Sequence, residues 1–444
     1  MAHTSIALFT RDLRVHDNPV LHAAAAAGQC IPVFVADEAI SRSPFHSANR
    51  SAFLADCLAD LDQALRKRGG HLVVRKGDPV AEVLELVRRH GVDEVHVAGD
   101  VSGFAQRRER RLAEAVDLCV HETSVTAVEP LSLTPTGNDH FAVFTPYFRK
   151  WQGVPRRGVL RAPRAISMPR VSPGKLPRAP KPDSPELPRG GETTARKLMN
   201  RWCRKDILDY ESAHDALAAD ATSRLSPYLH FGALSPVELL DRAGTESEGA
   251  RAFTRQLAWR DFHHQVLAAR PQCSTKDYRP HGDRWRGANA DFEAWRRGRT
   301  GYPIVDAAMR QLAGEGWMHN RGRLIVGSFL TKNLYLDWRL GARHFMELLV
   351  DCDIANNQMN WQWVAGTGTD TRPNRVLNPL AQARRYDPDG DYVRRYVPEL
   401  AGVAGSRVHE PWKLSGRDRD ELDYPEPIVD LDAEEFRMAR GKAG

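Results

Sequence analysis

The sequence predicts two successive architectures: an α/β domain built on a parallel sheet, followed by an all-α domain. Short β-like runs alternate with amphipathic stretches through the first third of the chain, which is typical of a Rossmann-like parallel sheet with helices on both faces. Beyond about Glu192 the strand signals end and helical spacing dominates. The 444 residues exceed one ordinary core, so we expect two or three domains.

The first domain is expected to span residues 1–130. Gly-containing turns separate its elements, and the absence of a GxGxxG motif means that a dinucleotide need not bind here. The predicted strands are residues 5–9, 31–35, 71–75 and 94–98, and the predicted helices are residues 47–68, 80–90 and 104–116.

A long interdomain linker is expected over residues 131–192, because residues 155–188 are rich in Pro, Arg and Lys. Such a segment is either extended over the surface or partly mobile. The helical domain is then residues 193–444. Its predicted helices are residues 194–208, 236–242, 250–268, 304–312, 323–336 and 343–350.

The composition, 42% hydrophobic and 27% charged, is that of a globular protein, and the net charge of +6 suits a polyanionic partner without proving one. No apolar run reaches the roughly 20 residues of a membrane span, and the start lacks a signal-peptide pattern. We therefore expect a cytoplasmic monomer without membrane contact. The six cysteines are scattered without CxxC, and HExxH is absent, so we expect buried thiols and no metal.

Residues 351–370, DCDIANNQMNWQWVAGTGTD, combine acidic groups, asparagines, two tryptophans and a Gly/Thr run. No helix or strand needs this mixture for packing, since Asn and Asp favour caps and turns. The mixture indicates a site with polar edges and aromatic faces, which suits a flavin ring, a nucleobase, or both.

Three further segments carry candidate chemistry. Residues 222–226, TSRLS before Pro227, can form a phosphate nest at a helix start or an ordinary N-cap, and Tyr210 could cover the bound group. The segment QLAWRDFH gives a polar and aromatic helix face, made by Gln256, Trp259, Arg260 and His263. Residues 301–323 join a helix to a loop that suits phosphate and base contact, with Trp317, His319, Asn320, Arg321 and Arg323.

Together these segments resemble the DNA photolyase/cryptochrome family over nearly the whole chain. The matching motifs occur in order along the sequence: TRDLRVHDNP (10–19), TGNDHFAVFTPYFRKW (136–151), TSRLSPYLHFGALSP (222–236), LAWRDF (257–262), TGYPIVDAAMRQL (300–312), GWMHNR (316–321), residues 351–370 and HEPWKL (409–414). The sequence is most similar to microbial class I cyclobutane pyrimidine dimer photolyases, and its Arg- and Ala-rich composition suggests an actinobacterial member.

The resemblance implies FAD, folded in a U shape, within the helical domain. Asn357 would face the flavin N5. The other residues implied to hold the cofactor are Tyr210, Thr222, Ser223, Arg224, Leu225, Ser226, Asn320, Arg323, Asp351, Cys352 and Asp353.

The resemblance also implies light-driven repair of pyrimidine dimers in UV-damaged DNA. Trp361, Trp338 and Trp285 would pass electrons from the surface, although each in isolation resembles a core residue. Trp259 and Trp363 would flank a flipped-out dimer. The remaining implied contacts to DNA or lesion are Gln256, Arg260, His263, Asn320, Arg321, Arg375 and Gln382. The alternatives are a blue-light signalling cryptochrome without repair and a dark flavin electron carrier.

This sequence departs from the family pattern on the lesion side. Gln256 stands where dimer-specific members usually have Glu, and Leu324 stands where Met is common. His319 is followed by Asn320 rather than a second histidine, which argues against (6-4) repair. Gln382-Ala383-Arg384 replaces the usual Gln-Gly step.

The N-terminal domain of relatives binds a light-harvesting antenna. The candidate residues stand near strand ends and are Phe34, Arg50, Asp100 and Phe104. We favour 8-hydroxy-5-deazaflavin over methenyltetrahydrofolate, because residues 99–111 lack the Asn-Glu pair of a folate pocket.

Overall fold

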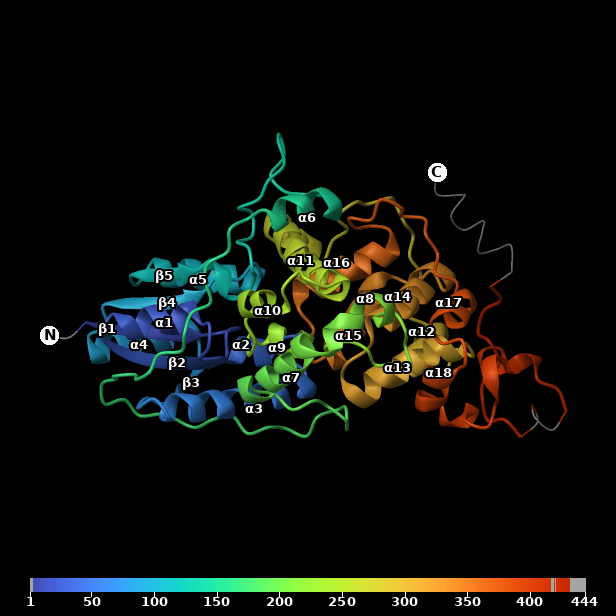
Figure 1. Ribbon diagram of the computed structural model, residues 1–444, viewed down its shortest axis with the longest axis horizontal. Coiled ribbons are helices and arrows are strands. Elements are labelled where there is room, and N and C mark those ends of the chain that lie inside the picture. Colours follow the sequence, from blue (N-terminus) through green and yellow to red (C-terminus); the bar gives the residue numbers. More distant parts are fainter. Residues whose placement is uncertain (1–2, 417–418, 420, 432–444) are drawn as a thin grey trace.

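The computed structural model describes residues 3–416, 419 and 421–431. The sheet and its helices occupy one end of the molecule, and the remaining helices form the other end (Figure 1). The predicted α/β domain followed by an all-α domain is therefore confirmed. The domain boundaries at residues 130 and 192 remain proposals, and the last part of the proposed helical domain, residues 432–444, lies outside the described residues.

The sheet is fully parallel, with the strand order β3-β2-β1-β4-β5. The chain first builds outward from β1 through β2 to β3, then crosses to the other side of β1. This reversal places a topological switch point between β1 and β4, where the carboxyl ends of parallel strands usually leave a binding crevice. The strands are β1 (Thr4–Phe9), β2 (Gln29–Asp37), β3 (Val73–Gly77), β4 (Glu94–Ala98) and β5 (Leu118–His121).

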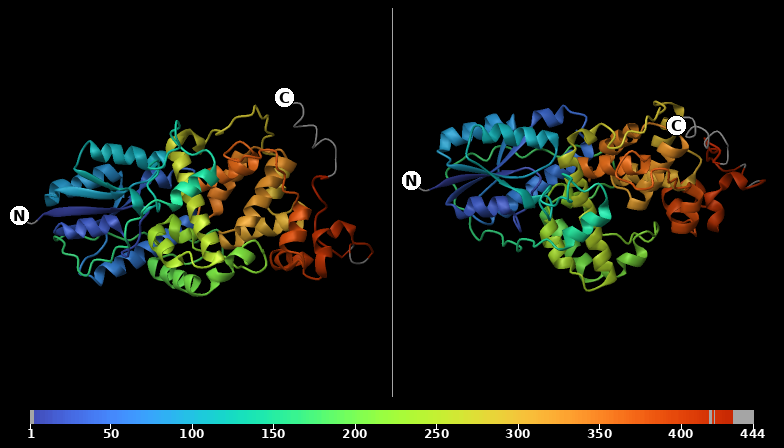
Figure 2. Two further views of the ribbon diagram at one scale, coloured as in Figure 1. Left: turned by 45° about the horizontal axis from the view of Figure 1, so that its top comes forward. Right: turned by 90° about the horizontal axis from the view of Figure 1, so that it is seen from above.

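Helices cover both faces of the sheet (Figure 2). Because side chains alternate along a strand, Ala7 and Phe9 pack with α1 (Pro19–Ala26) and α3 (Ala48–Arg66), whereas Ile6 and Leu8 pack with α4 (Pro79–His90) and α5 (Gly103–Ala113). A short helix, α2 (Glu38–Ser41), follows β2.

Three elements of this domain were not predicted: the one-turn helix α2, helix α1 and strand β5. Helix α1 has an Ala-rich sequence without strong amphipathic spacing, and its only start signals are the Asn18 cap and Pro19. Strand β5 has only four residues and is mostly half-buried at the sheet edge, so it lacks a clear apolar pattern.

Residues 153–190 carry no helix or named strand and run beside the sheet domain. Backbone hydrogen bonds tie them there: the N–H of Cys30 donates to the carbonyl of Ser167 (2.8 Å), and that of Val74 donates to Pro173 (2.6 Å). Before them, α6 (Phe144–Gln152) packs against α11 of the helical part. The stretch proposed as a linker thus contains one helix and an extended segment with fixed contacts.

The described residues beyond 191 form helices joined by turns and by longer irregular segments such as residues 275–289 and 366–378, with no named strand among them. One π-helical turn, Phe329–Asn333, follows α14 where a single helix over 323–336 was predicted. None of the described helices has the length and apolar character needed to cross a membrane. The helices are α7 (Glu192–Arg204), α8 (Tyr210–Ala213), α9 (Ser226–His230), α10 (Pro236–Ala243), α11 (Glu248–Ala269), α12 (Ala290–Arg296), α13 (Pro303–Glu315), α14 (Asn320–Ser328), α15 (Trp338–Leu348), α16 (Ile354–Ala365), α17 (Pro379–Tyr386) and α18 (Asp391–Tyr396).

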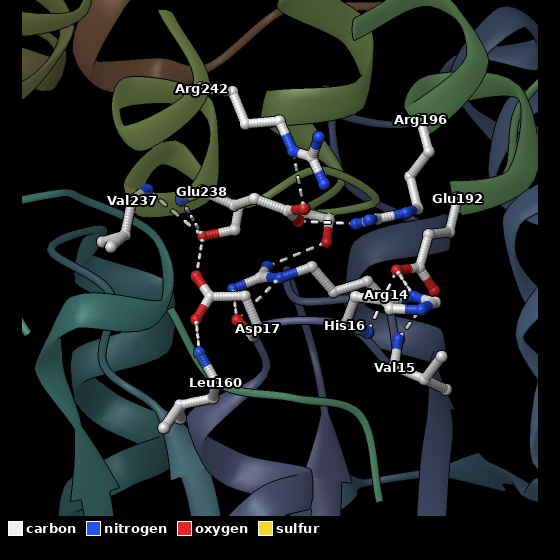
Figure 3. A network of polar contacts seen from close by, with 12 residues as sticks. Arg14, Val15, His16, Asp17, Leu160, Glu192, Arg196, Val237, Glu238 and Arg242 are labelled. Carbon is white, nitrogen blue, oxygen red and sulfur yellow. Dashed lines mark hydrogen bonds and ion pairs between the residues drawn. The ribbon is translucent and has the colours of Figure 1, made fainter. Parts of the chain in front are cut away.

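A buried polar network joins the loop after β1 to the helical part (Figure 3). The Arg14 guanidinium donates to the carbonyl of Gly232 (2.9 Å) and that of Asp17 (2.9 Å). The Asp17 carboxylate accepts from Arg157, from Ser235 and from the N–H of Leu160 (2.8 Å). These contacts fix the loop against α10.

The same loop is held from two further directions. Glu192, the first residue of α7, accepts from the N–H groups of Val15 (2.8 Å) and His16 (3.0 Å). Gly232 has a left-handed φ of 64°, and a Cβ there would lie 1.8 Å from the carbonyl oxygen of Arg11. Only glycine allows the two backbones to come this close.

Replacing Asp17 with Asn tests this network. Asn tolerates the left-handed backbone of this position (φ 48°), but it removes the buried charge that Arg157 faces. We expect Asp17→Asn to lower the free energy of unfolding at pH 7 by about 3 kcal/mol. Urea unfolding followed by circular dichroism measures the change, with the exposed Asp117→Asn as the matched control.

The pH dependence of the same difference is a second check. Burial opposes the charged form of Asp17, but the Arg157, Leu160 and Ser235 donors hold its pKa below the ordinary value. The stabilisation is therefore complete above the unfolded pKa of about 3.9 and is lost as the pH falls below it. A difference that grows in acid would contradict this account.

Candidate functional site

A cavity opens among α14, α15 and α16, with polar groups on one side and apolar groups on the other. Its residues come mostly from the segment that the sequence analysis singled out. They are Asn320, Arg323, Leu324, Phe345, Leu349, Asp351, Cys352, Asp353, Asn356, Asn357, Asn360, Trp361 and Val364.

Residues 354–365 of that segment form a regular helix, α16, which the residue composition argued against. The Asp353 carboxylate caps the helix by accepting from the N–H of Asn356 (2.9 Å), and Gly366 ends it with a left-handed φ of 84°. The spacing of Asp353, Asn357, Asn360, Trp361 and Val364 places them on one face. This helical spacing is present in the sequence, but the abundance of Asn and Asp argued against a helix there.

Asp351 is the anchor of the polar side. Its buried carboxylate accepts two hydrogen bonds from Arg323 (3.1 and 2.7 Å) and one from the Ser226 hydroxyl (2.6 Å). The Trp317 indole N–H donates to the same hydroxyl oxygen (3.1 Å). The structure thus brings Ser226, Arg323 and Asp351 together, as the resemblance implies.

Asp353 connects the cavity to the sheet domain. Its carboxylate pairs with Arg11, whose guanidinium also donates to Asp100 (3.0 Å), and His264 Nε2 lies 3.4 Å away. Burial opposes the charge, but His264 and Arg11 hold the pKa of Asp353 well below its usual range. The sequence analysis missed Arg11 and His264, because their partners are about ninety or more residues distant.

Asn357 and Cys352 present neutral groups to the cavity. The Asn357 side-chain N–H₂ donates to the carbonyl of Ala342 (3.1 Å), which leaves the carboxamide oxygen as the available atom. Burial raises the pKa of the Cys352 thiol to about 12, so the thiol stays protonated near neutral pH.

The TSRLS segment lies beside the cavity through Ser226, which begins α9. Arg224 has a left-handed φ of 51°; its guanidinium pairs with Glu315 (2.5 Å) and lies over the Trp317 ring. Helix α9 has only five residues, so its dipole is weak and the predicted nest depends on loop N–H and hydroxyl groups. The Tyr210 ring is buried against Trp202 and Phe253.

The three tryptophans of the expected electron path occupy one apolar cluster at different depths. Trp361 lines the cavity, Trp338 is fully buried, and Trp285 is partly exposed beside Tyr335. The Trp338 indole N–H donates to Asp277 (2.8 Å), whereas no described residue accepts from the indole N–H of Trp361 or Trp285.

On α11, Gln256 is exposed and Trp259 is half-buried, stacked on Phe144 with ring centroids 3.7 Å apart. His263 Nδ1 lies 3.0 Å from the carboxamide oxygen of Asn356. Arg260 differs from the expectation: its guanidinium is buried and donates to the carbonyls of Val125 (2.6 Å) and Leu229 (3.4 Å). The helical spacing in the sequence could not show which side of α11 faces the protein interior. We assign Arg260 to the domain interface because of these contacts.

The other residues expected to contact DNA lie around α14, α16 and α17. Arg375 is exposed with its guanidinium 5.5 Å from the Trp363 ring centroid, and Asn320 is exposed at the start of α14. Arg321 is paired with Asp215 (2.6 Å) and lies over the Tyr386 ring, so its charge is partly neutralised. The side-chain oxygen of Gln382 is buried without a hydrogen-bond partner among the described residues.

The four residues expected to bind an antenna differ in burial and in hydrogen-bond partners. Phe34 is buried in the core, and the Arg50 guanidinium donates to the carbonyls of Met346 (2.5 Å) and Leu349 (2.9 Å). Asp100 is bound to Arg11, and Phe104 is half-buried on α5. Arg50 and Asp100 therefore serve the domain interface, and the antenna role of the four remains a prediction.

A parallel-sheet domain joined to a helical domain with an acidic, amide-rich and aromatic cavity defines a cofactor-binding protein of two domains. Residues 5–166 match a family model described as DNA photolyase, and residues 253–441 match one described as the FAD binding domain of DNA photolyase. Deoxyribodipyrimidine photo-lyase of Streptomyces griseus is 57% identical over 453 residues, covering 99% of both chains. The Halobacterium salinarum protein of the same name is 37% identical, covering 95% of both.

Solved structures agree with these matches. A class III photolyase from Agrobacterium tumefaciens superposes with a TM-score of 0.92 at 33% identity, covering 100% of this chain and 98% of that one. An archaeal photolyase from Sulfolobus tokodaii, described with two FAD molecules, superposes with a TM-score of 0.82 at 30% identity. The superposition covers 99% of this chain and 100% of that one. The chain belongs to the DNA photolyase family, and its helical part is an FAD-binding domain.

The residues present fit FAD. Carboxylates, hydroxyls and amides suit sugar hydroxyls and the polar edge of a flavin, and Trp361 with Phe345 supplies aromatic walls. Three buried polar atoms near these residues have no hydrogen-bond partner among the described residues: Thr222 Oγ1, His319 Nε2 and Trp361 Nε1. Buried polar atoms normally find partners, so these atoms indicate that a ligand completes the site.

Asp351→Ala is expected to weaken FAD retention by at least about tenfold, because Arg323 and Ser226 lose their common acceptor in a buried position. The ratio of flavin to protein absorbance after gel filtration measures the loss. Asp389→Ala, at an exposed carboxylate outside the cavity, is the control and should retain FAD. Equal retention in both variants would remove Asp351 from the cofactor site.

Proposed function

We propose that this protein repairs cyclobutane pyrimidine dimers in UV-damaged DNA as a light-driven lyase, a deoxyribodipyrimidine photo-lyase. The main support is that helix α16 contributes residues both to the cavity proposed for FAD and to the neighbouring surface proposed for DNA. Its Asp353 cap, Asn357 and Trp361 line the cavity, and Trp363, two residues on, is partly exposed beneath Arg375.

The FAD that these residues would hold would supply, when reduced and illuminated, the one-electron chemistry that opens the cyclobutane ring. The protein residues hold and shield this chemistry. Asp351 and Asp353 fix the cofactor at carboxylates that are themselves anchored by arginines. The neutral Asn357 offers a hydrogen bond without adding charge. The apolar wall of Phe345, Leu349 and Val364 excludes water.

DNA binding is proposed around the cavity mouth, through the exposed Gln256, Asn320 and Arg375 and the half-buried Trp259 and Trp363. Arg contacts to phosphate position a duplex without reading its sequence, and a dimer costs less to flip out than an intact base. Binding should therefore depend on the lesion and tolerate any flanking sequence. Gln256 can both donate to and accept from the lesion, which the more common Glu cannot do when ionised.

An antenna chromophore in the N-terminal domain forms a separate proposal. We favour 8-hydroxy-5-deazaflavin over methenyltetrahydrofolate, on the absence of an Asn-Glu pair in residues 99–111. The Sulfolobus tokodaii structure is described as implying a novel light-harvesting cofactor, so a second flavin is a further alternative. An absorption spectrum of the purified protein separates these chromophores.

The repair proposal is tested with an oligonucleotide that carries one thymine dimer. Blue light on the reduced holoprotein should restore the thymine absorbance at its ultraviolet maximum over many turnovers, and darkness should not. Lesion binding without turnover, despite bound FAD, would favour the signalling alternative. Photoreduction without any lesion binding would favour an electron carrier.

Trp361, Trp338 and Trp285 are proposed to carry electrons from the surface to the cavity. Trp361→Phe removes no hydrogen bond to another described residue, because none of them accepts from the indole N–H. We expect the variant to photoreduce at least about tenfold more slowly, while chemically reduced variant still repairs dimers.

Flavin absorbance under blue light with an external reductant measures this effect. Trp202→Phe is the matched control, since Trp202 is equally buried, also lacks an N–H partner and lies in the other apolar cluster. Unchanged photoreduction in Trp361→Phe would disprove the path.

A further inference from the structure

A cluster of side chains with metal-binding chemistry lies on the sheet, away from the FAD cavity. Glu94 and His96 project from the start of β4, Cys119 from β5, and His3 immediately precedes β1. The carboxyl ends of β1 and β4 lead instead to Arg11 and Asp100, which face the helical part. The cluster is therefore at the amino ends of the strands, on the N-terminal side of the molecule (Figure 1).

The ligand atoms of this cluster converge on the Glu94 carboxylate. His3 Nε2 and His96 Nε2 each lie 3.0 Å from Glu94 Oε1, and Cys119 Sγ lies 3.8 Å from Oε2. One ligand atom each from Glu94, His96 and Cys119 falls within 4.8 Å of the others. Register explains the convergence, because His96 is paired with Cys119, and Glu94 is paired with Ser5, two residues after His3.

The His96 ring gives an independent indication of a missing ligand. Its Nδ1 shares a hydrogen bond with His121 Nε2 (3.1 Å), which orients the ring. Its Nε2 is buried and faces Glu94 Oε1, yet the contact lacks hydrogen-bond geometry and no other described residue partners this nitrogen. His96 is only 5% exposed, so water does not readily reach the ring. A cation bound beside the carboxylate gives His96 Nε2 the partner that it lacks.

We propose that Glu94, His96 and Cys119 bind a zinc ion, and that the exposed His3, whose ring contacts Glu94 but lies outside this group of mutually close ligand atoms, turns inward as the fourth ligand on binding. Imidazole, thiolate and carboxylate are the ligands that zinc takes in tetrahedral sites, whereas Mg²⁺ and Ca²⁺ prefer oxygen alone. On binding, the Cys119 thiol releases its proton to solvent and bonds to the metal as thiolate. Two residues that are not proposed ligands orient the ligands by hydrogen bonds. His121 binds the His96 ring, and the Ser5 hydroxyl donates to the Glu94 carboxylate (3.2 Å).

The zinc ion is a structural clip for the sheet edge. Strand β5 has four residues and pairs only with β4, so it is the weakly held edge of this sheet. A metal bound by residues of β4, β5 and the segment before β1 ties these three together. The sequence analysis expected no metal because it sought ligands close in sequence, whereas these residues meet only through strand pairing.

Tag-free holoprotein, treated with chelator and then titrated with zinc in a calorimeter, tests the proposal. We expect one zinc per chain, with binding weakened at least about tenfold in His96→Gln and in Cys119→Ser. Cobalt used as a probe should give a thiolate charge-transfer band that Cys119→Ser loses. Cys203→Ser, at a half-buried thiol on α7, is the control and should bind zinc as the parent does.

His3→Gln is a second test in case His96→Gln or Cys119→Ser fails to fold. The His3 side chain is 43% exposed, so we expect its replacement to leave the sheet intact. The His3→Gln variant should bind zinc more weakly, and zinc should raise its melting temperature by less than it raises that of the parent. Absence of stoichiometric zinc, or unchanged affinity in His96→Gln and His3→Gln, would overturn the proposal. FAD content and dimer repair, measured in the same samples, report on the proposed function separately.

Discussion

The position of the Arg11 guanidinium between Asp100 and Asp353 is the constraint on which the site depends. Asp100 follows strand β4, and Asp353 caps the helix that lines the cavity, so one side chain fixes the cofactor helix to the end of the sheet. The contact fills the topological switch point between β1 and β4 with protein. Removing either carboxylate would leave the partly buried Arg11 cation without its full set of partners, which costs more than the loss of a surface ion pair.

The buried charges at this interface fix the relative position of the two domains more than they increase the free energy of unfolding. Ion pairs of this kind often contribute little net free energy, because desolvation offsets the attraction, but they allow few alternative arrangements. Arg14, Arg50 and Arg260 act in the same way through backbone carbonyls of the other domain. The consequence is a cavity whose carboxyl groups are already oriented before a cofactor binds.

Sequence patterns predicted the two architectures because strand–helix alternation is a local signal. They missed β5 and α1, whose residues pack without clear periodicity, and they treated α16 as non-helical because Asn is a poor helix former in isolation. In α16 the cap of Asp353 and packing in the helical core outweigh that preference. Motif likeness found Ser226, Arg323 and Asp351, but it could not show that Arg260 is turned inward or that Arg11 reaches Asp353. Both facts depend on how distant segments dock.

Helix α16 is held from the side of α11 as firmly as from the sheet. His263 of α11 contacts Asn356, and burial lowers the His263 pKa to about 4, so this ring stays neutral near physiological pH. In the turn after α11, Ser274 accepts from Gln358 (2.6 Å). The cavity-lining residues of α16 are therefore held in place relative to α11, the helix that carries the residues proposed to contact the lesion. The proposed electron transfer over a short gap would need such fixed placement, and the Asn356 amide with the neutral His263 ring provides part of it between the two helices.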